Sequence, residues 1–110
     1  MNHGLSDATV KKIQAVLAGF PEVEKAVLYG SRAKGTFKPG SDIDLTLYGP
    51  ELSFRLLARI ETALDDLLLP YEMDLSLMSS ITHPALIDHI RRVGLVLYEK
   101  NAVPLEALPA

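Results

Sequence analysis

The chain has 110 residues, with 11 Lys and Arg against 14 Asp and Glu and a formal net charge of -3. A chain of this length buries enough surface for one hydrophobic core but not for two, so we expect a single domain. The small negative charge argues against direct nucleic-acid binding and against attraction to anionic lipid. The absence of cysteine excludes disulfides, thiol nucleophiles and cysteine-based zinc sites.

Neither a secretory leader nor a membrane span is expected from the residue pattern. The opening stretch, MNHGLSDATVKK, lacks the apolar core of a signal peptide. No window approaches the roughly 18 apolar residues that a membrane-spanning helix needs. A cytoplasmic location is therefore the default expectation.

The first part of the chain predicts a helix followed by two strands. Residues 7–20 carry apolar side chains at helical spacing, and Ser6 is a candidate N-cap. Residues 25–29 (KAVLY) form a short β-branched and aromatic run, which predicts a strand. Residues 43–48 predict a second strand, closed by a Gly-Pro turn.

A broad apolar stripe then predicts the longest helix, over residues 51–69. Its members recur at helical spacing and are expected to face the core: Leu56, Leu57, Ile60, Ala63, Leu64, Leu67 and Leu68. The polar residues between them, including Glu61, are expected to form an exposed helix face.

The last part of the chain predicts strand, helix, strand. Residues 71–78 alternate polar and apolar side chains, residues 83–93 form an amphipathic helix, and residues 95–99 (LVLYE) form a short strand. The whole order predicts a small α/β (α+β) sandwich, with helices flanking a mixed sheet of about four strands. We expect residues 1–99 to form the domain and residues 100–110 to be a loose or partner-bound tail.

Two carboxylates flank one apolar residue at the start of the second predicted strand. Because strand side chains alternate, Asp42 and Asp44 are expected to project to one side while Ile43 enters the core. Two residues of strand separate them by about 6.6 Å, and anions that close repel unless a cation lies between them. Mg²⁺ prefers oxygen ligands and needs few protein carboxylates. The pair therefore predicts a metal site.

A third carboxylate lies on the polar side of the strand predicted over residues 71–78. Asp74 is its central polar residue, and a neighbouring strand could place it beside Asp42 and Asp44. Glu72 shares the same side and is the alternative third ligand, although we favour Asp74. Three carboxylates on adjacent strands predict a two-ion site for phosphoryl chemistry. The oxygen ligands point to Mg²⁺ or Mn²⁺ rather than zinc.

A Gly-Ser pair ends the first predicted strand. A short helix beginning after Ser31 would offer free backbone N–H groups and a hydroxyl to an anion, and Gly30 would let a phosphate approach the backbone closely. Arg32, Lys34 and Lys38 add positive charge, although Lys38 is better explained as a solvated loop residue. The combination predicts a nucleotide-phosphate site.

The histidines are not expected to be catalytic. His83 is interpreted as a helix-start residue. His89 lies among Asp88, Arg91 and Arg92 and is expected on a solvent-exposed helix face.

The spacing of these residues resembles a known signature. Gly30-Ser31, ten intervening residues, Asp42-Ile43-Asp44 and a later in-strand Asp74 resemble the nucleotidyltransferase superfamily that includes polymerase beta and kanamycin nucleotidyltransferase. More narrowly, GSRAKG followed by SDIDL in a short chain resembles the minimal nucleotidyltransferases. These are the MNT or MntA-type antitoxins that pair with HEPN-domain ribonuclease toxins. The resemblance covers residues 27–77.

This resemblance implies a fold, a reaction and a partner. It implies that Asp42 and Asp44 ligate two magnesium ions, and that Asp74 ligates the catalytic ion and assists deprotonation of the acceptor hydroxyl. It implies that the β and γ phosphates of ATP are held by Gly30 and Ser31, with Arg32 as a helper. The family often has arginine where this chain has Lys34. The implied reaction is AMP transfer from ATP to a tyrosine of a HEPN toxin, within a hetero-complex, so that the toxin is silenced.

Two other functions stay open. The chain could be an antitoxin that neutralises its partner by binding alone, because it lacks the length for the extra acceptor-holding domain of larger transferases. It could also be a small-molecule nucleotidyltransferase of the aminoglycoside-modifying kind that completes its site with a second chain.

Overall fold

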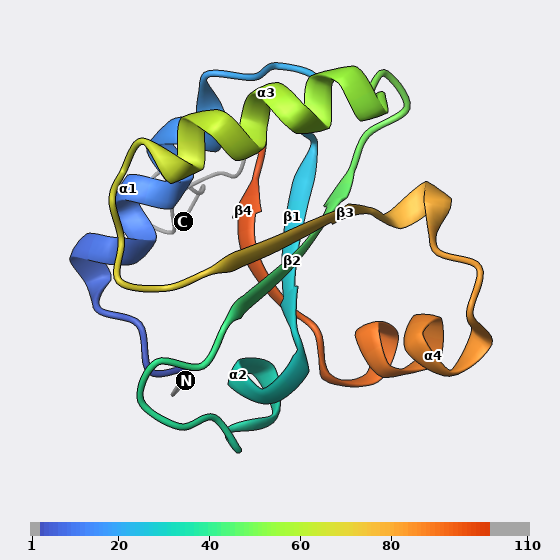
Figure 1. Ribbon diagram of the computed structural model, residues 1–110. Helices are drawn as coiled ribbons and strands as arrows, with labels where there is room; N and C mark the ends of the chain where they lie inside the picture. Colours follow the sequence, from blue (N-terminus) through green and yellow to red (C-terminus); the bar gives the residue numbers. More distant parts are fainter. Residues whose placement is uncertain (1–2, 102–110) are drawn as a thin grey trace, which may run out of the picture.

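The computed structural model describes residues 3–101, in which helices and strands alternate (Figure 1). In chain order the elements are α1 (Asp7–Ala18), β1 (Lys25–Tyr29), α2 (Gly30–Lys34), β2 (Ile43–Tyr48), α3 (Phe54–Asp65), β3 (Met73–Leu77), the short 3-10 helix η1 (Met78–Ser80), α4 (Pro84–Val93) and β4 (Leu95–Glu99). The predicted mixed α/β fold is confirmed. Most of the predicted tail, residues 102–110, lies outside the described residues.

The four strands form one mixed sheet in the order β3-β2-β1-β4. β1 is antiparallel to both β2 and β4, whereas β2 and β3 are parallel. A parallel pair needs a crossover connection, and α3 lies in the segment that joins β2 to β3. The two central strands are β2 and β1. Asp44 lies on β2, Asp42 lies directly before it, and Asp74 lies on the parallel neighbour β3.

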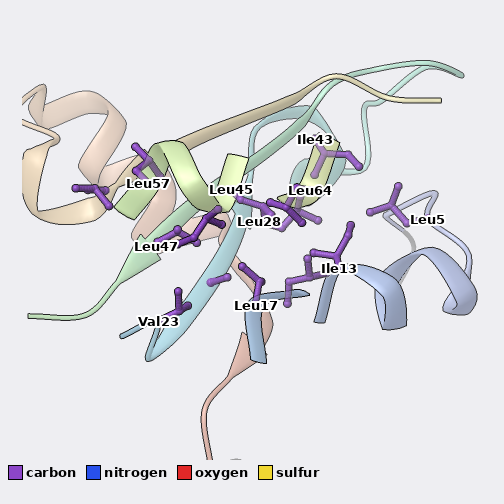
Figure 2. Packing of buried hydrophobic residues seen from close by; sticks show 14 residues of the cluster. Leu5, Ile13, Leu17, Val23, Leu28, Ile43, Leu45, Leu47, Leu57 and Leu64 are labelled. Atoms are coloured by element: carbon purple, nitrogen blue, oxygen red, sulfur yellow. The ribbon is translucent and has the colours of Figure 1, made fainter. Parts of the chain in front are cut away.

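One face of the sheet carries the main hydrophobic core, covered by α1 and α3 (Figures 1 and 2). Alternate residues of β2 enter this core because strand side chains alternate between the two faces. The buried cluster includes Ile43, Leu45 and Leu47 from β2, Ile13 and Leu17 from α1, and Leu57, Ile60 and Leu64 from α3. This packing fixes β2 so that Asp44 and Thr46 project from the opposite face.

The opposite face has a smaller apolar cluster beside a polar area. Val27 and Tyr29 of β1 pack against Ile90 of α4, and α4 also contacts α2. The side chains at positions 44 and 46 of β2, and at 74 and 76 of β3, project from this same face. The polar area next to α4 is therefore where the candidate site is built.

The longest predicted helix is shorter than the sequence suggests. The hydroxyl of Ser53 accepts from the backbone N–H of Leu56 at 3.1 Å, so the helix begins at an N-cap rather than at residue 51. It ends at Asp65, and Leu68 has a φ of 55° and is 88% exposed. The prediction that Leu68 faces the core is wrong, because α3 ends before this residue and the left-handed backbone at Leu68 turns the chain away from the helix. No helix within residues 3–101 has the length and apolar character needed to cross a bilayer.

Candidate active site

Asp44 and Asp74 lie side by side on the polar area of the sheet. They occupy paired positions on the parallel strands β2 and β3, where neighbouring strands are about 4.8 Å apart. Asp44 is half-buried and Asp74 is exposed to solvent. The exposed carboxylate of Asp74 can therefore contact a ligand that arrives from solvent, while the partly buried carboxylate of Asp44 holds the same ligand against the sheet.

Asp42 lies just before β2 and is exposed, while Ile43 between the two aspartates is fully buried. The predicted split of these residues between solvent and core is therefore present. The backbone N–H of Ile43 donates to the carbonyl of Glu72 at 2.9 Å, so Glu72 lies beside the start of β2. It is Asp74, and not Glu72, that pairs with Asp44 in the strand register.

The carboxylates act on one another electrostatically. Burial raises the pKa of Asp44 above its usual value, and the negative charges of Asp74 and Asp42 raise it further. The nearby imidazole of His89 acts in the opposite direction. A partly buried carboxylate whose closest charged neighbours are also acidic gains stability when a cation is bound.

Three polar side chains, those of Tyr29, Thr46 and Ser76, lie on the same face of the sheet as these carboxylates. Burial raises the pKa of the Tyr29 phenol, the charges of Asp74 and Asp44 add to this effect, and the adjacent Ser76 hydroxyl opposes it. The hydroxyls of Thr46 and Ser76 are buried without a well-formed hydrogen bond. Because they occupy paired positions one strand repeat beyond the aspartates, these hydroxyls leave hydrogen-bonding capacity at the base of the site.

Gly30 forms a tight contact with Asp44. Its φ of 74° lies in the left-handed region that glycine adopts without strain. A β-carbon at this position would collide with the Oδ2 atom of Asp44. Glycine is therefore required twice, once for the backbone turn from β1 into α2 and once for the close approach of the carboxylate.

His89 belongs to the candidate site, contrary to the sequence prediction. Its Nε2 atom accepts a hydrogen bond from the backbone N–H of Gly30 at 3.0 Å. Its ring meets that of Tyr29 edge to face, with centroids 6.3 Å apart. The prediction of a wet helix face is wrong because His89 follows Leu86 by three residues, which places both on the side of α4 that faces the sheet. The three-residue spacing between Leu86 and His89 was the signal in the sequence that could have predicted this placement.

The short helix expected near Ser31 is present as α2, which begins at Gly30. Ser31 is half-buried, and its carbonyl accepts from the N–H groups of Gly35 and Thr36 in the turn that ends the helix. Lys34 and Lys38 are both exposed. Because Tyr29 pairs with Asp44, the Gly-Ser pair that follows Tyr29 lies at the same end of the sheet as Asp44.

Arg32 does not face the same way as its basic neighbours. Its side chain is 1% exposed, and its guanidinium donates to the backbone carbonyls of Ser41 and His3. Sequence reasoning placed this residue beside the nucleotide. The structure places it inside the loop that leads to Asp42.

The acidic residues fit a divalent cation of the magnesium type. Within residues 3–101 no three His, Cys, Asp or Glu side chains are already gathered into a complete metal cage. Mg²⁺ does not require one, because it keeps several waters and takes one or two carboxylates together with phosphate oxygens of its substrate. The paired Asp44 and Asp74, with Asp42 two residues earlier, supply that kind of donor set.

A separate hollow of about 590 Å³ lies between α1 and the edge strand β4. Its lining includes Gln14, Ala15 and Val96, and β4 is at the end of the sheet farthest from β3. It has no acidic pair or glycine turn. The candidate site is therefore the acidic area of the sheet rather than this hollow.

The architecture matches solved toxin–antitoxin structures. A crystal structure of a toxin–antitoxin complex with AMP-PNP aligns with a TM-score of 0.68 and 23% identity, over 84% of this chain and 74% of the other. A tri-AMPylated Shewanella oneidensis HEPN toxin in complex with MNT antitoxin aligns with a TM-score of 0.65 and 19% identity, over 87% and 74%. An MntA–HepT complex gives 0.65 and 20%, over 86% and 74%. At these identities the likeness establishes the fold.

A comparison with curated proteins returned no match. The family model described as polymerase beta, nucleotidyltransferase matches residues 11–103. That span contains the Gly-Ser turn and all three aspartates, so the sequence signature and the observed register describe one site. The chain belongs to the polymerase beta nucleotidyltransferase family.

Proposed function

We propose that this chain is a Mg²⁺-dependent protein adenylyltransferase that moves AMP from ATP to the hydroxyl of a tyrosine on a HEPN-domain toxin. By modifying the toxin it acts as an antitoxin. The observation that carries the proposal is the in-register pair Asp44 and Asp74 next to the Gly30 turn. The structural neighbours include a HEPN toxin carrying AMP in complex with its MNT antitoxin, which supports the choice of acceptor and partner.

In the proposed mechanism Asp42, Asp44 and Asp74 would hold two Mg²⁺ ions, or Mn²⁺ in their place. Such ions would neutralise charge on the phosphoryl oxygens and lower the pKa of the attacking oxygen. Asp74 is suited to receive the proton of the acceptor hydroxyl because it is exposed and lies beside the half-buried Asp44. The carboxylate of Asp44 is held by the sheet and by its contact with Gly30.

The Gly-Ser turn is proposed to hold the terminal phosphates of ATP. Ser31 offers a hydroxyl at the start of α2, directly after the glycine whose left-handed backbone makes the turn. The acceptor oxygen then attacks the α phosphorus in line, and pyrophosphate departs toward Ser31. The hydrogen bond between His89 and Gly30 keeps this turn in place during transfer. We do not include Arg32 among the phosphate ligands, because its guanidinium is bonded to the protein backbone.

The test is label transfer from α-labelled ATP to a co-expressed HEPN partner, combined with the intact mass of that partner. The wild-type chain is expected to add mass in multiples of AMP, and the double variant Asp42→Asn with Asp44→Asn is expected to add none. A partner that gains no mass yet stays inhibited by both proteins would overturn the proposal in favour of neutralisation by binding. Transfer to an aminoglycoside without a partner would instead identify a small-molecule enzyme.

A further inference from the structure

Arg32 is a buried cation whose described contacts are all with backbone carbonyls and aromatic rings. Its Nε and Nη2 atoms donate to the carbonyl of Ser41 at 3.1 and 2.8 Å, and Nη1 donates to the carbonyl of His3 at 3.0 Å. The guanidinium also lies over the rings of Phe37 and Tyr71, 5.2 and 4.7 Å from their centroids. Within residues 3–101 the one recorded ion pair is Arg92 with Asp88, so no carboxylate neutralises Arg32 there.

These contacts join the parts of the molecule that form the candidate site. The carbonyl of Ser41 belongs to the peptide bond that enters Asp42. Phe37 lies in the same loop between α2 and β2, and Tyr71 lies in the segment that leads into β3 and Asp74. One side chain on α2 therefore contacts both segments that deliver the carboxylates.

Burying a charge without an opposite charge is costly, so the contacts that offset the cost indicate what the residue does. Charge-assisted hydrogen bonds are about twice as strong as neutral ones, and an aromatic face adds roughly 0.5–2 kcal/mol. All of these contributions depend on residues 37–41 and 71 staying where they are. The buried charge therefore stabilises the position of the loop rather than a contact with a phosphate from solvent.

The geometry points to Arg32 as a positioning residue that acts on catalysis through the Ser41–Asp42 peptide. It fixes the loop of residues 36–42 against α2, so that Asp42 is held ready for the metal ion. The catalytic consequence rests on the proposed function, whereas the loop-fixing role does not. Lysine cannot replace arginine here, because its single ammonium nitrogen cannot reach the carbonyls of Ser41 and His3 at once, whereas the planar guanidinium donates to both from different nitrogens.

The deciding experiment uses the full-length chain with Arg32→Lys, and with Lys34→Met as a control. Lys34 is a cation on the same helix, but its side chain is exposed. Hydrogen exchange is measured on the free protein without metal or ATP. Amides of residues 36–42 are expected to exchange at least about tenfold faster in Arg32→Lys and to stay at the wild-type rate in Lys34→Met.

Two binding measurements separate positioning from direct ligand contact. Mn²⁺ binding, followed by electron paramagnetic resonance, is expected to weaken by about tenfold in Arg32→Lys, as for other residues that orient metal ligands. ATP affinity without metal is expected to stay within about twofold of wild type. A loss of metal-free ATP affinity with unchanged loop exchange would overturn the inference and make Arg32 a phosphate ligand. Unchanged exchange together with unchanged Mn²⁺ binding would also overturn it.

A second variant covers the case in which Arg32→Lys does not fold. Phe37→Leu removes one of the two rings over the guanidinium and leaves its hydrogen-bonding atoms in place. The same exchange and Mn²⁺ measurements are then made on Phe37→Leu. We expect faster exchange of the loop amides and weaker Mn²⁺ binding, and no change in either would count against the inference. Because these readouts need no AMP transfer, they still hold if the wild-type chain proves inactive toward a HEPN partner.

Discussion

Asp44 and Asp74 face each other as paired residues on parallel strands, although thirty positions separate them in the chain. We expect Asp74→Asn to lower kcat/KM for AMP transfer by at least about 100-fold, because a general base of this type contributes about 10²–10⁴-fold. Glu72→Gln, on the same side of the segment, is the control. It is expected to stay within a factor of about three. Equal losses in the two variants would contradict the assignment of Asp74.

The carboxylate of Asp44 is expected to destabilise the metal-free protein at neutral pH. Its pKa is raised in the folded state, mainly by burial and then by the charges of Asp74 and Asp42. A raised folded pKa contributes stability that is complete below the ordinary value of about 3.9 and is lost as the pH rises through the folded pKa. Asp44→Asn should therefore raise the Tm at pH 7 by a few degrees.

The same prediction has two internal checks. The gain in Tm should shrink as the pH falls through the raised pKa and vanish below about 3.9. Added Mg²⁺ should stabilise the wild-type chain more than Asp44→Asn. Glu61→Gln, which removes an exposed carboxylate from α3, should leave the Tm nearly unchanged. Stabilisation by both substitutions alike would point to net charge rather than to the acidic cluster.

Two glycines with nearly equal backbone angles allow a matched test of the Gly30 contact. Gly30 and Gly35 have φ values of 74° and 81°, but only at Gly30 would an added methyl group meet Asp44, whereas nothing lies within 4 Å at Gly35. Gly35→Ala is expected to cost about 1 kcal/mol of unfolding free energy from backbone strain alone. Gly30→Ala is expected to cost more and to abolish AMP transfer. Equal urea midpoints and equal activities would show that the Asp44 contact is unimportant.

The hydrogen bond between α4 and the Gly-Ser turn predicts a difference between two histidines. His89→Leu leaves the half-buried N–H of Gly30 without its acceptor, at a cost of about 1–3 kcal/mol in unfolding free energy. His83→Leu changes an exposed residue that makes no side-chain cap and should change that energy by less than about 0.5 kcal/mol. Urea denaturation measures both, and a similar loss in the two variants would count against the described role of His89.

Two leucines of one predicted stripe should differ strongly in their contribution to stability. Leu64 is 1% exposed and Leu68 is 88% exposed. Leu64→Ala is expected to lower the free energy of unfolding by about 2–5 kcal/mol through the cavity it leaves, and Leu68→Ala by less than about 0.5 kcal/mol. A large loss at Leu68 would mean that this leucine is covered by another molecule in solution.

The sequence predicted well those features that depend on local chemistry. The alternation around Ile43 correctly separated a buried side chain from two acidic ones, because one face of β2 is sealed by the core. Ser6 was expected to cap the first helix, and its hydroxyl accepts from the N–H of Thr9 at 3.1 Å. The strand positions likewise followed from short β-branched and aromatic runs and, for β3, from the alternation of polar and apolar residues, so the fold class could be predicted without the structure.

The features missed by the sequence depend on contacts between distant segments. An arginine in a basic, glycine-rich stretch looks like a phosphate ligand, and its burial depends on Tyr71 and His3 arriving from other parts of the chain. The hydrogen bond from Gly30 to His89 spans 59 positions. The end of α3 was missed because apolar spacing continues into Leu68 after the backbone has already turned. The roles proposed for the site residues remain predictions that the variants above test.

The parallel pairing of β2 with β3 makes the candidate site depend on a contact between segments that are far apart in the chain. Asp42 and Asp44 are contributed by a strand that pairs with its immediate predecessor, whereas Asp74 arrives only after α3 has carried the chain back across the sheet. A slip of β3 by one residue in its pairing with β2 would reverse which side chains of β3 meet solvent and turn the third acid toward the leucines. A nascent or partly unfolded chain therefore lacks the complete acidic triad, which ties the chemistry to the integrity of the whole domain.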